Sequence, residues 1–218
     1  MGASACVLIG YFTGTINPAY ILSRIKGFDI RTRGSGNAGA TNSFLTMGKI
    51  FGILCALVDI FKGFLAFRFA KYVFPHLEYA GMLAGASCIL GHIFPIWLGF
   101  RGGKGLACIA GMVLAFNWKV FLGLLVFEIA LTLAVDYICV MAMSLAVIVP
   151  VVYVWMTRDL IGSIALLFAG VVVECKHMDN IQRIREGSEL HLSFLWNKEA
   201  EIVRVMEALG EDRTDELA

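Results

Sequence analysis

The sequence predicts an all-α integral membrane protein with about seven transmembrane helices. Of its 218 residues, 59% are hydrophobic and 16% are charged, and the mean hydropathy is +0.78. A soluble domain of similar length would be about half apolar and a quarter charged. The apolar residues also form long runs, and a run of about 20 apolar residues is long enough to cross a bilayer as a helix. Basic residues gather in the segments between these runs, as is typical of polytopic membrane proteins.

The first half of the chain contains three such runs. We expect transmembrane helices over about residues 4–23, 50–72 and 77–98, each close to the length that a bilayer requires. Pro18 is a candidate kink in the first helix, because proline removes a backbone hydrogen bond.

The second run carries two ionisable residues, Asp59 and Lys62. They lie on one helix face because they are three residues apart. Charged groups within a span are costly and are normally paired or line a cavity. An ion pair facing the bundle interior and a link to a substrate site are both compatible with this pattern.

The second half is apolar over residues 106–175, which is too long for two ordinary spans. Polar breaks at 117–119, 136–137 and 157–159 divide it into four segments. The first of these, residues 106–116, is shorter than a bilayer requires unless it is tilted. We therefore favour seven spans, with five as the alternative.

The basic residues indicate how the chain is oriented. With seven spans, 13 of the 18 Lys and Arg residues fall in the segments 24–49, 101–104 and 176–213, which share one side of the membrane. Five spans give the same result because the parity is unchanged. The positive-inside rule makes this side cytoplasmic. The net charge of +1 gives no overall field that would favour nucleic acid.

Cysteines and the end of the chain suggest no further chemistry. Five cysteines lie in apolar segments and are expected to be small buried hydrophobes, namely Cys6, Cys55, Cys88, Cys108 and Cys139. Residues 1–196 form the expected membrane domain and residues 197–218 a cytoplasmic tail. Apolar residues at helical spacing in the tail predict one amphipathic helix, docked or lying on the membrane surface, before a disordered end.

The first polar segment is glycine-rich and reads Gly34-Ser35-Gly36-Asn37-Ala38-Gly39-Ala40-Thr41-Asn42. Glycines let a backbone adopt positive φ and turn its N–H groups toward one point, where they can bind an anion. Further donors are available from the side chains of Ser35, Asn37, Thr41 and Asn42. A flexible interhelical loop is the alternative interpretation.

The second polar segment follows His92 and reads Arg101-Gly102-Gly103-Lys104-Gly105. It is not a nucleotide P-loop, because Leu98 and Gly105 stand where that motif requires Gly and Ser or Thr. Glycines at the start of a helix still suit a phosphate, and Lys104 supplies a point charge. A positive-inside anchor would not require the glycines. His92 fits either this site or a hydrogen-bonded position at the membrane interface.

The third polar segment directly follows the last span. His177, Asn180 and Arg183 are three residues apart, so they share one face if the segment is helical. A histidine, an amide and a guanidinium are suited to holding a phosphate and moving a proton. A cationic stop signal would explain Arg183 but not the histidine and the amide.

Together, the three segments resemble the bacterial membrane glycerol-3-phosphate acyltransferases that use acyl phosphate as donor. That family carries GSGN-x-GATN, then GH-x-FP…GGKG, then H-x-x-NI-x-R…G-x-E. Matching residues here are 34–42, 91–105 and 177–189. The resemblance covers about residues 4–195 and implies a seven-helix protein with its site at the cytoplasmic face.

The resemblance implies transfer of a fatty acyl group from acyl phosphate to the 1-hydroxyl of glycerol 3-phosphate, which gives lysophosphatidate in phospholipid biosynthesis. It implies no cofactor and no metal. The implied catalytic residues are Ser35, Lys104, His177 and Asn180. The implied substrate-binding residues are Gly34, Gly36, Asn37, Gly39, Thr41, Asn42, His92, Arg101, Gly102, Gly103, Gly105 and Arg183. We expect a monomer in the lipid of a bacterial inner membrane, with no nucleic-acid partner.

Two positions depart from the family pattern. Ala38 stands where proline is usual, and Leu45 stands where the family often has an arginine. One phosphate ligand is then missing unless a nearby cation replaces it, the candidates being Arg31, Arg33, Lys49 and Arg101. A divergent paralogue with weak or altered activity is the alternative within the family. The alternative function is a non-catalytic membrane protein that binds or transports a small phosphorylated solute.

Overall fold

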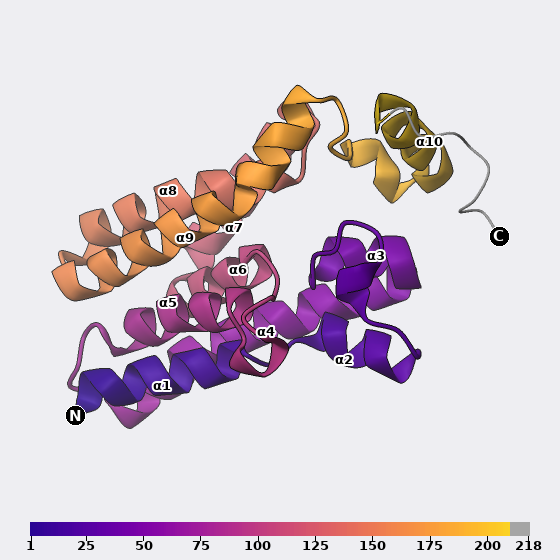
Figure 1. Cartoon of the computed structure of the whole chain (residues 1–218). Coiled ribbons are helices and arrows are strands. Elements are labelled where there is room, and N and C mark those ends of the chain that lie inside the picture. The colour runs from indigo at the N-terminus through magenta and orange to yellow at the C-terminus, as the bar shows by residue number, and fades with distance from the viewer. Residues whose placement is uncertain (210–218) are drawn as a thin grey trace.

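A computed structural model describes residues 1–209, and within this range the chain is helical apart from its loops (Figure 1). The α-helices are α1 (Gly2–Gly14), α2 (Pro18–Ile25), α3 (Ala40–Met47), α4 (Lys49–Val73), α5 (Ala80–Ile93), α6 (Leu106–Phe116), α7 (Trp118–Val135), α8 (Cys139–Thr157), α9 (Leu160–Arg185) and α10 (Lys198–Leu209). Short 3-10 helices are η1 (Ile30–Thr32), η2 (Ile96–Leu98) and η3 (Leu192–Leu195). The predicted disordered end of the tail, from residue 210, lies outside the described residues.

The prediction of about seven transmembrane helices is confirmed. By length and composition, six segments of the described chain are able to cross a membrane, counting α1 and α2 as one. The seventh is α6, whose 11 residues rise only about 16 Å. Its last residue, Phe116, packs against Phe67 of α4 and Tyr153 of α8.

The first span is interrupted rather than merely kinked at the predicted proline. α1 ends at Gly14, and Pro18 occupies the first turn of α2, where its missing N–H costs nothing. The side chain of Asn17 caps α2 by accepting a hydrogen bond of 2.8 Å from the N–H of Tyr20. The interruption leaves the carbonyl of Ile16 outside both helices.

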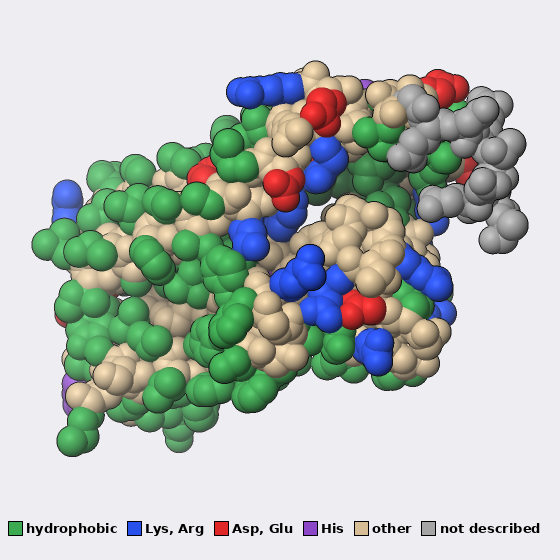
Figure 2. Space-filling view, viewed as in Figure 1, with side chains coloured by type: hydrophobic (Ala, Val, Ile, Leu, Met, Phe, Trp, Pro, Cys, Tyr) green, Lys and Arg blue, Asp and Glu red, His purple; other side chains and the backbone are tan. Residues whose placement is uncertain are grey.

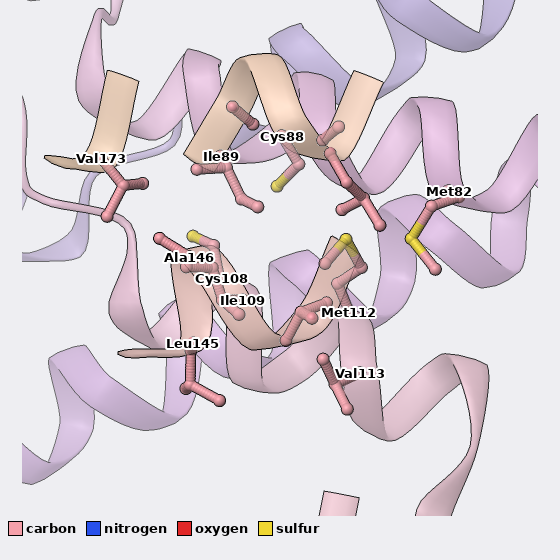
Figure 3. Close-up of a cluster of buried hydrophobic side chains, with 14 of the residues drawn as sticks. Met82, Cys88, Ile89, Cys108, Ile109, Met112, Val113, Leu145, Ala146 and Val173 are labelled. Carbon is pink, nitrogen blue, oxygen red and sulfur yellow. The ribbon is translucent and has the colours of Figure 1, made fainter. Parts of the chain in front are cut away.

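The hydrophobic core lies between α5 and α6, which α8 and α9 cover. Met82, Cys88 and Ile89 of α5 face Ile109 and Met112 of α6 (Figure 3). The five cysteines predicted to be buried are all buried and free. Their small, apolar side chains therefore contribute packing, as expected.

Glycines allow two helix pairs to approach within backbone contact. On α1, Gly10 faces the backbone of Ala84 and Gly14 faces the backbone of Cys88. On α6, Gly111 faces the backbone of Ile60 in the same way. Small residues of this kind are what membrane helices use to pack, because lipid provides no hydrophobic drive between helices.

A cluster of charged side chains is buried at the place where α1 ends. Lys62 lies 2.7 Å from the carboxylate of Asp59, and the side chains are 4% and 3% exposed. The Lys62 ammonium also donates to the carbonyl of Ile16 at 2.6 Å and lies 2.8 Å from Nδ1 of His92. Three polypeptide segments are therefore tied together: α4, the interruption of the first span and the end of α5.

The same cluster contains three potential metal ligands. Atoms of Asp59, His92 and Cys108 lie within 4.8 Å of one another. The positive Lys62 ammonium already lies between Asp59 and His92, and this charge disfavours a second cation.

The predicted ion pair between Asp59 and Lys62, facing the bundle interior, is confirmed.

Substitution of Gly14 by leucine should destabilise the protein. Its side chain would collide with the backbone of Cys88, and such overpacking costs about 1–3 kcal/mol. Thermal unfolding in detergent should show the loss. The control is Gly123→Leu, since Gly123 of α7 has open space around it. Equal stability of the two variants would contradict the proposed α1–α5 contact.

Substitution of Asp59 by asparagine should also destabilise the protein. It leaves the Lys62 ammonium buried without its counter-ion, and breaking such a pair costs about 3–5 kcal/mol. The double variant Asp59→Asn/Lys62→Met removes both charges and should recover most of the loss. Chemical unfolding in detergent measures both. A single variant as stable as the unchanged protein would show that the pair contributes nothing.

Candidate active site

The three polar segments of the sequence meet at one end of the bundle. The Asn17 side chain donates to the carbonyl of Ala38 at 2.9 Å, which fixes the first segment beside the interruption of the first span. Arg31, just before the first segment, donates at 2.6 Å to the carbonyl of Leu98, just before the second segment, and so holds the two segments near each other. Lys and Arg side chains gather around a hollow between α9 and the part of the chain that contains α2 and α3 (Figure 2).

The first segment is shaped by Asn42. Its side chain donates to the carbonyls of Ile30 and Arg33, both at 3.0 Å, and accepts from the N–H of Ser35 at 3.0 Å. Asn42 is fully buried, and these contacts tie the end of the segment to its start and to the residues just before it. Gly34 has a φ of +56°, and a side chain there would collide with the Asn42 amide.

The segment runs into the N-terminus of α3. Gly39 occupies the N-cap position of this helix, and no side chain caps it. The first N–H groups of a helix lack partners within the helix and carry partial positive charge. The predicted donors Ser35 and Thr41 are exposed beside this helix end, and Asn37 is half-buried.

The second segment folds back onto the end of α5. The N–H groups of Gly102 and Gly103 donate to the carbonyls of Ile93 and His92, at 3.0 and 3.1 Å. These two glycines are therefore paired with protein, and a side chain on Gly103 would collide with the imidazole of His92. Arg101 is exposed.

Lys104 and the N-terminus of α6 remain for an anion. Gly105 has a φ of +94°, a conformation that favours glycine, and stands at the N-cap of α6 without a side-chain cap. Gly103 and Ala38 are neighbours, since a Cβ atom on Gly103 would lie 3.1 Å from the carbonyl oxygen of Ala38. Ala38 directly precedes the N-cap residue of α3. Two uncapped helix N-termini thus lie at one place, which suits a negatively charged ligand.

The third segment lies on α9, and the predicted helical face is confirmed. His177, Asn180 and Arg183 all belong to this helix, and the first two are buried. The carbonyl oxygen of Val173 can only accept, so Nδ1 of His177 donates to it at 2.8 Å. Nε2 of His177 is then the nitrogen that can accept a proton.

Asn180 connects Lys104 to Glu189. Its side-chain oxygen accepts a hydrogen bond from the Lys104 ammonium, and its nitrogen donates to the Glu189 carboxylate at 2.6 Å. Arg183 donates to the other oxygen of Glu189 at 2.7 Å. Burial lowers the pKa of Lys104 below that of an ordinary lysine, and the positive charge of Arg183 lowers it further.

The cations nearest the first segment already have partners. Arg31 lies 2.7 Å from the carboxylate of Asp29 and holds the pKa of Asp29 at about 2. Arg33 lies over the ring of Phe28, 4.4 Å from its centroid.

A different cation lies beside Leu45. The ammonium of Lys198, from α10, donates to the Leu45 carbonyl at 2.5 Å. Sequence reasoning missed this residue because it lies 153 positions further along the chain. No local pattern could have signalled it.

An apolar cavity of about 200 Å³ begins next to the site. Its wall includes Leu106, which directly follows Gly105, and it continues along α6 past Ala110 to Val113. Residues of α4, α7 and α8 complete the wall. The one charged residue among them, Glu128, has its carboxylate bonded to the Ser144 hydroxyl at 2.7 Å. The cavity surface is therefore apolar.

Comparison with known proteins gives a consistent result. The family model for glycerol-3-phosphate acyltransferase matches residues 4–187. A glycerol-3-phosphate acyltransferase of Prochlorococcus marinus (strain MIT 9215) is 36% identical over 188 residues, covering 84% of this chain and 94% of the relative. One from Staphylococcus saprophyticus is 34% identical over 197 residues, covering 87% and 97%.

Solved structures agree with this match. The glycerol 3-phosphate form of PlsY, an integral membrane glycerol 3-phosphate acyltransferase, has a TM-score of 0.81 and 28% identity, covering 89% of this chain and 98% of that one. The lysophosphatidic acid form has a TM-score of 0.77 and 26% identity, covering 93% and 99%. The family match, the relatives and the shared fold agree, and the chain belongs to the glycerol-3-phosphate acyltransferase family.

Proposed function

We propose that the protein transfers a fatty acyl group from acyl phosphate to the 1-hydroxyl of glycerol 3-phosphate, giving lysophosphatidate and phosphate. The observation that carries this proposal is the meeting of two uncapped helix N-termini, Lys104 and an apolar cavity at one place. Both substrates carry phosphate, and one also carries an acyl chain. Such a site offers an environment for each of these groups.

The phosphates would bind at the helix ends. The N-termini of α3 and α6 supply oriented N–H groups, and Lys104 supplies a full positive charge. Ser35, exposed on the first segment, would add a hydroxyl donor to a phosphate or to the acyl carbonyl. We assign the buried Asn42 and His92 to shaping these loops, because their side chains form hydrogen bonds with protein groups.

The reaction would proceed by direct transfer. The 1-hydroxyl oxygen attacks the acyl carbonyl carbon, the bond from that carbon to the phosphate oxygen breaks, and phosphate leaves with the electron pair. Acyl phosphate is a mixed anhydride with a good leaving group, so positioning and charge stabilisation are the main requirements. The hydroxyl proton would pass to Nε2 of His177, which the Val173 carbonyl leaves free to accept.

The acyl chain would enter the cavity along α6. Leu106 lines this cavity and directly follows Lys104 and Gly105 in sequence, so a carbonyl held near Lys104 would direct its chain between α6 and α7. Leu125 of α7, one of the lining residues, is also exposed on the outer surface. The acyl chain would therefore enter the cavity from the surrounding lipid, beside Leu125.

Several further features belong to the same proposal. The site faces the cytoplasm of a bacterial inner membrane, supported by the excess of basic residues in the loops that form it. Residues 1–196 form the catalytic membrane domain, residues 197–218 form a cytoplasmic tail, and the protein acts as a monomer without cofactor or metal.

The proposal is tested with purified protein in detergent. Phosphate should be released from palmitoyl phosphate only when glycerol 3-phosphate is present, with lysophosphatidate formed in equal amount. Lys104→Met should lower kcat/KM by about 100-fold or more, as expected for loss of a group that stabilises developing charge. Phosphate release that does not depend on glycerol 3-phosphate would contradict acyl transfer. Uptake of glycerol 3-phosphate into proteoliposomes without acylation would favour a transporter.

Blocking the cavity should change the preference for acyl chain length. In Ala110→Phe, a large ring fills the cavity below Leu106, so the ratio of kcat/KM for palmitoyl over octanoyl phosphate should fall on the order of tenfold. The KM for glycerol 3-phosphate should not change. The control is Leu122→Phe, which adds the same ring on the exposed face of α7. An unchanged ratio in Ala110→Phe would place the acyl chain elsewhere.

A further inference from the structure

The chain continues beyond the part that the family match covers. The match ends at residue 187, whereas η3 (Leu192–Leu195) and α10 (Lys198–Leu209) follow it. α10 lies beyond the end of α9 and close to α3 (Figure 1). What α10 contributes does not follow from the acyl transfer described above.

Arg204 of α10 binds the loop that follows α9. Its guanidinium donates to the carbonyl of Gly187 at 2.6 Å and to the carbonyl of Glu189 at 2.5 Å. It also donates to the Glu201 carboxylate at 2.6 Å. A planar guanidinium that makes three such contacts holds its partners in one geometry.

Glu201 holds the same loop from a second point. Its carboxylate accepts from the N–H of His191 at 2.7 Å and from the hydroxyl of Ser193 at 3.0 Å. It is 5% exposed, so the carboxylate itself is buried, whereas the side chain of its partner Arg204 is 31% exposed. The loop from residue 187 to 193 is thereby fixed to α10 at four places.

Glu189 transmits this fixation to the site. Its backbone is held by Arg204, and its carboxylate accepts from Asn180 at 2.6 Å and from Arg183 at 2.7 Å. Asn180 in turn accepts from Lys104. Lys104 is thus two hydrogen-bonded side chains away from the loop that α10 holds.

α10 also contacts the opposite wall of the hollow. Lys198 donates to the carbonyl of Leu45 in α3 at 2.5 Å. The ring of Phe194 in η3 packs edge-on against Phe44, with centroids 5.3 Å apart. The segment from η3 to α10 therefore joins α3, which begins at the first polar segment, to the end of α9.

We propose that α10 is a positioning element for the acyl-transfer site: Arg204, paired with Glu201, fixes the loop of Glu189 and thereby sets the position of Asn180 and Lys104. This inference rests on the proposed function for its activity readout. Arg204 touches no substrate in this scheme and acts through Glu189 alone. Lys104 should be misplaced when Arg204 is removed, even though α9 itself is intact.

The test compares Arg204→Ala with Arg185→Ala. Arg185 is an exposed arginine at the end of α9, and the scheme gives it no role. Arg204→Ala should lower kcat/KM for glycerol 3-phosphate on the order of 10- to 100-fold, as displacement of a positioned group by about 1 Å can do. Arg204→Lys should recover part of this loss, and Arg185→Ala should retain full activity.

The pH profile separates positioning from a general loss of structure. Lys104 holds an anion only while it is protonated, so kcat/KM falls as the pH rises through its pKa. The negative charge of Glu189 raises that pKa. Displacing Glu189 should therefore move the alkaline limb of the profile to lower pH. The titratable and charged groups that face Lys104 are Cys139, His177, Asp179, Arg183 and Glu189.

A second readout does not depend on catalysis. Acetic anhydride labels neutral amines, so mass spectrometry of Lys104 labelling against pH follows its ionisation directly. The midpoint should move to lower pH in Arg204→Ala and in Glu189→Gln, but not in Arg185→Ala. If the unchanged protein shows no acyl transfer, the proposed function fails while the labelling experiment still tests the positioning.

Two results would overturn the inference. One is an Arg204→Ala protein whose labelling midpoint matches that of the unchanged protein. The other concerns the double variant Lys104→Met/Arg204→Ala. A residue that acts through Lys104 should have no further effect once Lys104 is replaced. If Arg204→Ala lowers activity as much in the Lys104→Met protein as in the unchanged protein, the inference is wrong.

Discussion

The polar end of the molecule depends on a charge buried in the membrane bundle. The Lys62 ammonium bonds to the Ile16 carbonyl and lies against Asp59 and His92, so it joins α4 and α5 to the interruption of the first span. His92 lies directly under Gly103. The placement of the glycine loop therefore follows from the pairing of one lysine in a medium where an unpaired charge is costly.

From this anchor, the site is built mainly from helix ends. The glycines of the second segment do not offer their own N–H groups, because Gly102 and Gly103 donate to the end of α5. Their small size instead lets the loop lie against His92 so that α6 begins at Gly105. Asn42 closes the first segment in a comparable way and leaves α3 uncapped. Positive ends of helices and Lys104 are thereby concentrated beside an apolar cavity, which suits a phosphorylated substrate with a fatty chain.

The local sequence predicted much of the site but not how its parts are connected. His177, Asn180 and Arg183 could be assigned to one helical face from their spacing alone, and the structure confirms this. The substitution at Leu45 suggested a missing cation, with candidates sought among neighbours in sequence. The structure brings Lys198, at the start of α10, to the carbonyl of Leu45 in α3. Tertiary contacts between residues more than 100 positions apart carry no signal in one sequence.

By itself the sequence determined the membrane class, about seven spans and the family resemblance, because hydropathy and motifs are properties of short segments. It also predicts the sidedness of the loops from the asymmetry of their charges. The apolar runs also predicted α6 as a separate helix, although its 11 residues are fewer than a membrane span requires. Only the tertiary structure decided which groups meet: the contact of Lys62 with the interrupted first span, the pairing of the glycine N–H groups, and the link from Arg204 to Lys104 through Glu189 and Asn180. These depend on how helices cross, and helix crossing is set by packing over the whole bundle.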